Sequence, residues 1–144
     1  MNFTISSAVK GVGELLRTRI LPEIGDDYAA NMARMACSVL AISANWVDGA
    51  AELRVEENAR LRALLGKAAP IVGGELAVRL AEAAGSADPG LKISVLDREN
   101  DRLRRLLVGA HGVIEGLAGE EARGLDAEIW GTLEAIEMAR APVE

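Results

Sequence analysis

The sequence predicts an all-α fold, and three observations carry this prediction. Alanine and leucine, which favour helices, dominate the apolar content, whereas only 3% of the residues are aromatic. Apolar residues recur every three or four positions, and no stretch alternates as a half-buried strand would. The nine-residue pattern ENxRLRxLL occurs twice. We therefore expect an antiparallel bundle of four to five helices with one long helix, at about 27–65.

Length and charge narrow the class of protein. A chain of 144 residues is the size of one domain, so we expect 1–144 to form a single helical bundle. A net charge of −6 argues against binding to nucleic acid or to an anionic membrane surface. The N-terminus lacks the basic and apolar regions of a secretory signal, and the longest uncharged apolar-rich run, 35–47, is too short to span a bilayer. These features predict a cytoplasmic protein.

The first half of the chain predicts two helices. Ser6 or Ser7 can cap a short amphipathic helix that Pro22 ends or kinks. A long helix then starts near Asp27, and Asp48-Gly49 is the most favourable place for a break in it. Its main apolar stripe has the spacing of core positions, and we expect most of it to be buried. The stripe contains Tyr28, Met32, Met35, Val39, Ile42, Trp46, Gly49 and Leu53.

The second half predicts three helices. A turn over 66–74, which contains Pro70, precedes a short helix at 75–84. The loop 85–90 can supply Ser86 or Asp88 as the cap of a helix at about 91–117. A last helix ends near Arg140, before Pro142. Three glycines inside the helix at 91–117 predict close approach of a neighbouring helix or, as the next explanation, a bend; they are Gly109, Gly112 and Gly116.

The two copies of ENxRLRxLL are residues 57–65 and 99–107, which lie 42 positions apart. Both copies predict core helices that bury their leucines and leave their arginines at the rim. An arginine stripe in the second copy could bind phosphate groups or an acidic partner, or form ion pairs with nearby carboxylates. The stripe consists of Arg98, Arg102 and Arg105.

Few residues of the sequence are candidates for catalysis, metal binding or ligand binding. His111 is the only histidine and Cys37 the only cysteine, so the sequence predicts no metal site, no disulfide and no cofactor. No phosphate-binding loop, nucleophile elbow or HExxH pattern is present. Trp46 lies in the apolar stripe of the long helix, and Trp130 lies at the edge of the last helix's stripe. We regard His111, Trp46, Trp130 and the arginine stripe as candidate ligand- or partner-binding residues.

Several short segments resemble an uncharacterised family of small bacterial helical proteins, which is associated with aminoglycoside-phosphotransferase-like kinases and acyl-CoA dehydrogenases. The segments are 20–22 (ILP), 35–36 (MA), 39–42 (VLAI) and 60–66 (RLRALLG), so the resemblance covers roughly the first half of the chain. It implies an accessory role beside acyl-CoA or kinase chemistry and carries over no catalytic residue.

Three functions fit these observations. The first is a non-catalytic interaction or accessory module that forms a homodimer, because a helix longer than its neighbours leaves apolar surface to bury. The second is a bundle that binds a small or acyl-chain ligand between its helices, beside the arginine stripe. The third is an enzyme, which would require His111, Cys37 or the arginines to converge in one pocket. The sequence favours the first.

Overall fold

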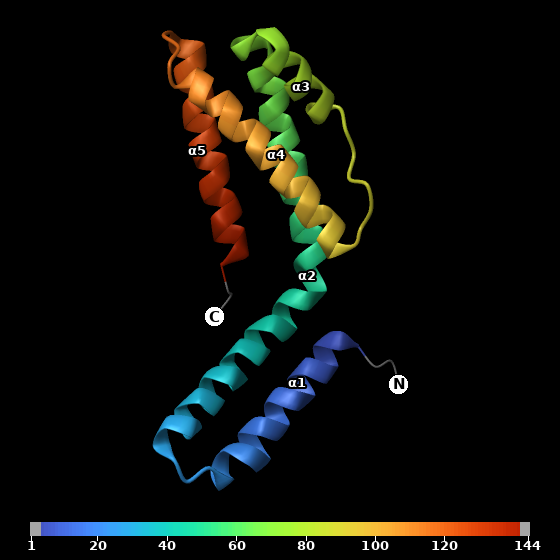
Figure 1. The fold of residues 1–144 in the computed structure, drawn as a ribbon, viewed down its shortest axis with the longest axis vertical. Helices are drawn as coiled ribbons and strands as arrows, with labels where there is room; N and C mark the ends of the chain where they lie inside the picture. The colour runs from blue at the N-terminus through green and yellow to red at the C-terminus, as the bar shows by residue number, and fades with distance from the viewer. Residues whose placement is uncertain (1–3, 142–144) are drawn as a thin grey trace. The chain divides into compact units, whose positions relative to one another are not determined.

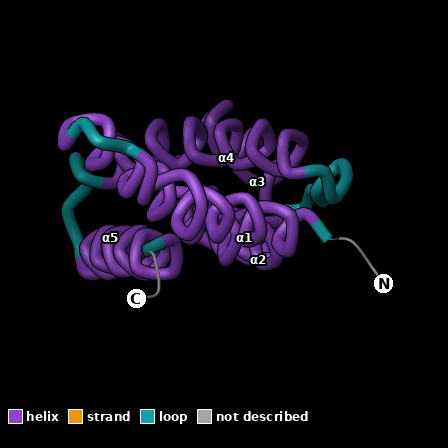
Figure 2. Tube along the Cα trace, turned by 90° about the horizontal axis from the view of Figure 1, so that it is seen from below, coloured by secondary structure: helices purple, strands orange, loops and turns teal. Residues whose placement is uncertain are grey.

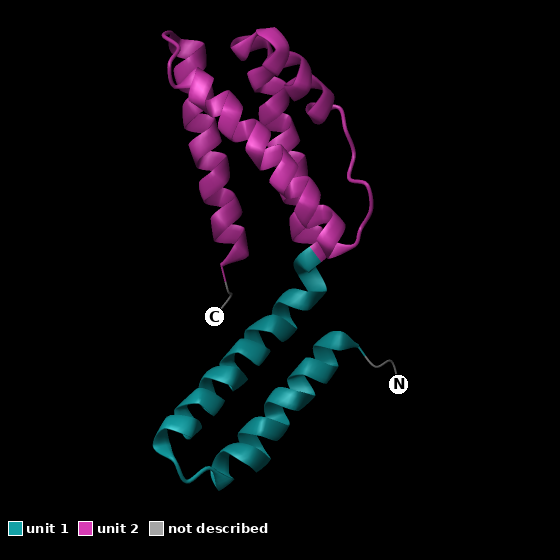
Figure 3. Cartoon of the chain, in the orientation of Figure 1, with its two compact units in different colours: residues 1–50 teal, residues 51–144 magenta. Residues whose placement is uncertain are grey.

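The computed structural model describes residues 4–141, and its contacts divide the chain into two compact units. Unit 1 comprises residues 1–50 and unit 2 comprises residues 51–144 (Figure 3). Within 4–141 all regular structure is helical, as Figure 2 shows, so the all-α prediction is confirmed. No helix in the described part of the chain is long and apolar enough to cross a membrane.

Unit 1 is a helical hairpin in which a run of irregular helix follows the regular helix of its first arm. Its elements are α1 (Ile5–Leu15), the π-helix η1 (Leu16–Ile20), the 3-10 helix η2 (Leu21–Glu23) and the first part of α2 (Asp27–Val72). Thr4, rather than Ser6 or Ser7, caps α1, and its hydroxyl forms a capping box with Ser7. Pro22 lies inside η2, where the regular helix has already ended.

Small side chains form the seam of this hairpin. Gly13 of α1 lies against Leu40 of α2, and a Cβ at Gly13 would be 3.6 Å from the Leu40 Cβ. The Ser6 hydroxyl donates to the carbonyl oxygen of Ala44 at 2.9 Å. The buried hydrophobic residues of unit 1 are two alanines, Ala30 and Ala44. The hairpin therefore holds no large buried apolar side chain among its described residues.

Unit 2 contains the core of the protein. The second part of α2 and α4 (Ile93–Ile114) run in the same direction, and α3 (Gly74–Ala84) and α5 (Glu120–Arg140) run back (Figure 1). This up-and-down order brings the leucines of both repeat copies into one cluster, as the sequence predicts. The largest fully buried apolar side chains of the unit are Leu61, Leu65, Leu80, Leu96, Leu103, Ile114 and Ile129.

The long helix continues further than the sequence predicts. The predicted turn at 66–74 is wrong over most of its length, because α2 runs to Val72 with Pro70 inside its last turn. The repeat accounts for this end point: Val72 lies 42 positions before Ile114, where α4 ends. Pro70 has no amide hydrogen to donate to the carbonyl oxygen of Gly66, and the helix ends two residues later. Gly73, with φ of 68°, then reverses the chain into α3.

The glycines of α4 do not mark a helix contact. A Cβ built at Gly109 or Gly112 meets nothing within 4 Å, and one at Gly116 would approach only the nearby Val113 carbonyl oxygen at 3.5 Å. The predicted close approach of another helix is therefore wrong. Gly109 and Gly112 lower the stability of α4 and have no contact that offsets the loss, whereas Gly116 lies in the turn that follows the helix.

Replacing Gly109 by alanine is expected to raise the free energy of unfolding by about 0.5–1 kcal/mol, because it lowers the backbone entropy of the unfolded chain and meets no neighbour. Gly73→Ala is the control. It is expected to lower the free energy of unfolding, because the φ of 68° at Gly73 strains any residue that has a Cβ. Urea denaturation followed by circular dichroism measures both. A destabilised Gly109→Ala would contradict the open environment of α4 at this position.

Candidate functional site

The two copies of the repeat pack directly against each other in unit 2. Arg62 of the first copy donates to Glu99 of the second at 2.8 Å. Arg104, the equivalent of Arg62, donates to Glu57, the equivalent of Glu99, at 2.6 Å. Each copy thus supplies the arginine that pairs with the other copy's glutamate. This reciprocity is that of a two-fold contact, formed here within a single chain.

Two asparagines lie at the centre of this contact. Asn100 donates to the Asn58 side-chain oxygen at 2.9 Å, and both residues are buried. Asn58 in turn donates to Asp88 at 2.9 Å. Every buried side-chain nitrogen and oxygen of the described residues has a hydrogen-bond partner. The contact is therefore a satisfied polar network inside an otherwise apolar core.

The surroundings of the two glutamates differ. Glu57 also accepts from Arg140 of α5 at 2.7 Å, whereas Glu99 also accepts from Arg102 of its own helix at 2.8 Å. Burial opposes ionisation of Glu57, but hydrogen bonds from Arg104, Asn100 and Arg140 outweigh it and lower its pKa.

The pKa of Glu99 is also lowered, mainly by the hydrogen bond from Arg102, against the opposing effect of burial. Arg62 contributes a second favourable hydrogen bond. Glu57 and Glu99 are therefore held ionised, so neither glutamate is suited to act as a general acid near neutral pH.

The network corrects three expectations. Arg62 is not at the rim, because its side chain is only 11% exposed. Asp88 does not cap α4, since it accepts from Arg62 at 2.8 Å, and Ser86 donates to the Ala83 carbonyl oxygen. The N-cap of α4 is Lys92, which makes no side-chain capping bond.

The predicted arginine stripe stays at the surface. Arg98, Arg102 and Arg105 are all exposed, and the expected ion pair of Arg102 with Glu99 is present at 2.8 Å. Arg102 and Arg105 line an open groove of about 440 Å³ together with Arg79 of α3, whereas Arg98 is not among its lining residues. Binding of a small or acyl-chain ligand beside these arginines stays a prediction.

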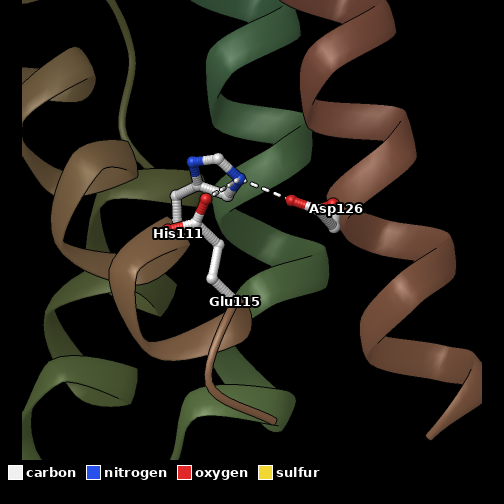
Figure 4. A group of neighbouring side chains, drawn as sticks. All are labelled: His111, Glu115 and Asp126. Atoms are coloured by element: carbon white, nitrogen blue, oxygen red, sulfur yellow. Dashed lines mark hydrogen bonds and ion pairs between the residues drawn. The ribbon is translucent and has the colours of Figure 1, made fainter. Parts of the chain in front are cut away.

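His111 and Trp130 are brought together by α4 and α5. Their ring centroids lie 5.4 Å apart with the rings nearly perpendicular. His111 Nε2 lies 2.6 Å from an oxygen of Asp126 on α5 and 3.9 Å from an oxygen of Glu115, one turn later in the chain (Figure 4). A histidine that the sequence places at a helix edge thus has two carboxylates beside it.

Trp46 belongs to unit 1 and lies on α2 in a stripe with Tyr28, Met32, Met35, Val39 and Ile42, which we call the outer stripe. The structure does not bury this stripe: Tyr28 is 75% exposed, Met35 62% and Trp46 47%. The expectation that these residues form core is therefore wrong for the single chain. Cys37 is half-buried, and its thiol lies 3.8 Å from the Gly13 carbonyl oxygen of α1.

The main functional residues that sequence reasoning missed are polar. Glu57, Asn58, Glu99 and Asn100 belong to the repeated pattern, so their recurrence at the same positions was the available signal. A polar residue that recurs beside core leucines indicates a role in packing rather than solvation. Asp126 carries no such signal, because its position beside His111 depends on how α5 returns along α4.

Comparison of the chain with protein-family models, curated proteins and solved structures finds no match.

Replacing Glu57 by alanine is expected to lower the free energy of unfolding by about 2–4 kcal/mol, because it removes the acceptor that Arg104, Arg140 and Asn100 share. The neighbouring Glu56→Ala is the matched control, because Glu56 is exposed and lies 4.0 Å from Arg60. It is expected to change stability by at most about 0.5 kcal/mol. Equal losses of stability in Glu57→Ala and Glu56→Ala, measured by urea denaturation, would show that the polar network does not stabilise the fold.

The lowered pKa values predict loss of stability in acid. Glu57 and Glu99 have ordinary values of 4.5, and their folded values lie below this. The unfolded chain then binds more protons, so the contribution of these groups is complete above about pH 5.5 and is lost as the pH falls below 4.5 through the folded values. Urea denaturation between pH 3 and 7 should show a flatter profile for Glu57→Gln than for Glu56→Gln. Identical slopes of stability against pH in the two variants would contradict a lowered pKa of Glu57 in the folded protein.

Proposed function

We propose that this chain is a non-catalytic helical interaction module that self-associates, and that the outer stripe of α2 in unit 1 is the interface between two copies. The exposed apolar side chains of unit 1 carry this proposal. Eleven of the 19 exposed large hydrophobic residues fall between Ile5 and Val47, whereas 17 of the 19 buried hydrophobic residues fall in unit 2. Unit 1 thus has its large apolar side chains outside and its small ones inside.

The geometry of α2 separates two stripes. The inner stripe, which includes the residues that contact α1, consists of Ala30, Ala33, Cys37, Leu40 and Ala44. The outer stripe consists of Tyr28, Met32, Met35, Val39, Ile42 and Trp46. At about 100° per residue, the two stripes lie roughly 160° apart around the helix. Since α1 occupies the inner face, it cannot also cover the outer one.

Charge supports burial of the outer stripe. Between Tyr28 and Val47 the only charged residue is Arg34. A helix face that meets water usually carries Lys, Glu, Asp or Arg, and a helix that is apolar on opposite faces is normally covered on both. The small residues that neighbour the stripe also allow close approach of a second helix.

A second copy of the chain is the occupant that best fits this surface. The stripe has alternating spacings of four and three residues, which suits interdigitation with the same stripe on a symmetric partner. It spans about 27 Å of helix. Six large side chains with roughly 100 Å² exposed each, together with flanking alanines, approach the about 800 Å² per partner of a standard interface. Two hairpins joined in this way form a four-helix bundle.

Val39→Glu tests this interface, with Val108→Glu as its matched control. Val39 is 61% exposed in the outer stripe, and Val108 is 73% exposed on α4 of unit 2. Light scattering coupled to gel filtration, at micromolar concentration, is expected to give a mass near twice 15.2 kDa for the wild type and for Val108→Glu. Val39→Glu is expected to be a monomer, because a buried carboxylate without a partner destabilises an interface.

A wild-type mass of 15.2 kDa would contradict self-association. A dimer that persists in Val39→Glu and dissociates in Val108→Glu would place the interface on unit 2 instead. Far-UV circular dichroism of both variants confirms that the charge has not unfolded the monomer.

A further inference from the structure

We propose that His111, Glu115 and Asp126 form a binding site for a divalent transition-metal ion of the zinc type. This site is independent of the proposed self-association, because its residues lie in unit 2. One nitrogen of His111 and one oxygen from each carboxylate lie within 4.8 Å of one another (Figure 4).

The distances suit one shared ion. Zinc binds imidazole nitrogen and carboxylate oxygen at about 2.0–2.2 Å, so two ligand atoms of a tetrahedral site lie about 3.3 Å apart. The His111 Nε2 to Asp126 Oδ1 distance, 2.6 Å, is shorter than this, and the Nε2 to Glu115 Oε1 distance, 3.9 Å, is longer. Each distance therefore differs from the value that the ion requires by about 0.6–0.7 Å, which is within the reach of a side-chain adjustment.

The charges of the cluster also favour a divalent cation. In the described residues, the only ion-pairing partner of Glu115 and of Asp126 within 4.0 Å is His111. A protonated imidazole balances only one of the two carboxylates. A doubly charged cation bound to neutral imidazole balances both, so binding relieves the repulsion between them.

The backbone positions the three ligands from two helices. His111 lies in the last turn of α4, Glu115 is the C-cap residue directly after α4, and Asp126 lies in the second turn of α5. The ring of Trp130 packs edge-on against His111 and restricts the orientation of the imidazole. The His111 side chain is 15% exposed and that of Glu115 58% exposed, so solvent reaches the site from the Glu115 side.

An imidazole and two carboxylates select among metals. Imidazole nitrogen suits zinc, cobalt, nickel and iron better than magnesium or calcium, which prefer oxygen ligands alone. Three protein ligands leave a fourth position of a tetrahedral ion for water. Because the ion joins α4 to α5, its binding is expected to stabilise unit 2.

The test is titration of the chain, free of any histidine tag, with Zn²⁺ alone. Isothermal calorimetry is expected to show one site per chain with micromolar affinity. His111 is the only histidine of the sequence, so its imidazole proton signals in NMR spectra report directly on the site. These signals are expected to shift on addition of Zn²⁺ and to stay unchanged on addition of the same concentration of Mg²⁺.

Asp126→Asn is expected to weaken binding at least tenfold, because it removes one ligand charge. The control is Glu128→Gln, which lies two residues further along α5 and removes an exposed carboxylate that pairs with Lys67 instead of His111. It is expected to leave the affinity and the NMR shifts unchanged. Should Asp126→Asn fail to fold, Glu115→Gln at the exposed end of α4 serves in its place, with the same expected loss.

Absence of saturable Zn²⁺ binding by the wild type would overturn the proposal. Equal loss of binding in Asp126→Asn and Glu128→Gln would overturn it as well, since it would indicate general attraction to an acidic surface. Light scattering with and without Zn²⁺ separates this inference from the dimer proposal: the mass is expected to be the same in both, and a mass that doubles only with Zn²⁺ would place the ion between two chains.

Discussion

The contact between two buried asparagines, Asn58 and Asn100, determines how unit 2 is assembled. A buried amide without a partner costs free energy, so the core helices α2 and α4 are favoured in the register that brings these two side chains together. The crossed arginine–glutamate pairs on either side impose the same register. Single polar residues in helical interfaces specify register in this way in coiled coils, at some cost in stability. The two copies of the repeated pattern thus specify the register in which α2 and α4 pack against each other.

The two units use their residues in opposite ways. Unit 2 satisfies its buried polar groups and encloses its large apolar side chains, so its core is complete in a single chain. Unit 1 encloses only alanines and exposes the outer stripe. A hairpin of this kind gains little from burial in isolation, because burial of each large apolar side chain stabilises a fold by about 1.5–3 kcal/mol. This imbalance is the reason why we propose an interaction surface on unit 1.

Local pattern predicted much of the fold, and long-range geometry decided the remainder. The spacing of Leu61 and Leu103 predicted two core helices correctly, because helical periodicity is a local property. The same spacing predicted that Met35 would be buried, but periodicity does not say whether a helix exists to cover that face. The pairing of Arg62 with the other copy's glutamate required knowing that the copies touch. The contact of His111 with Asp126 depends on the return of α5.

A double-mutant cycle on Asn58 and Asn100 tests the central claim most directly. Each single replacement by alanine removes one amide and deprives the other of the hydrogen bond between them, leaving its remaining partners in place, whereas the double replacement removes both amides. Urea denaturation of the four proteins is predicted to show that the double variant loses less stability than the sum of the single losses, by about 1 kcal/mol or more. Additive losses would contradict the claim that this pair specifies how the two copies of the repeat pack.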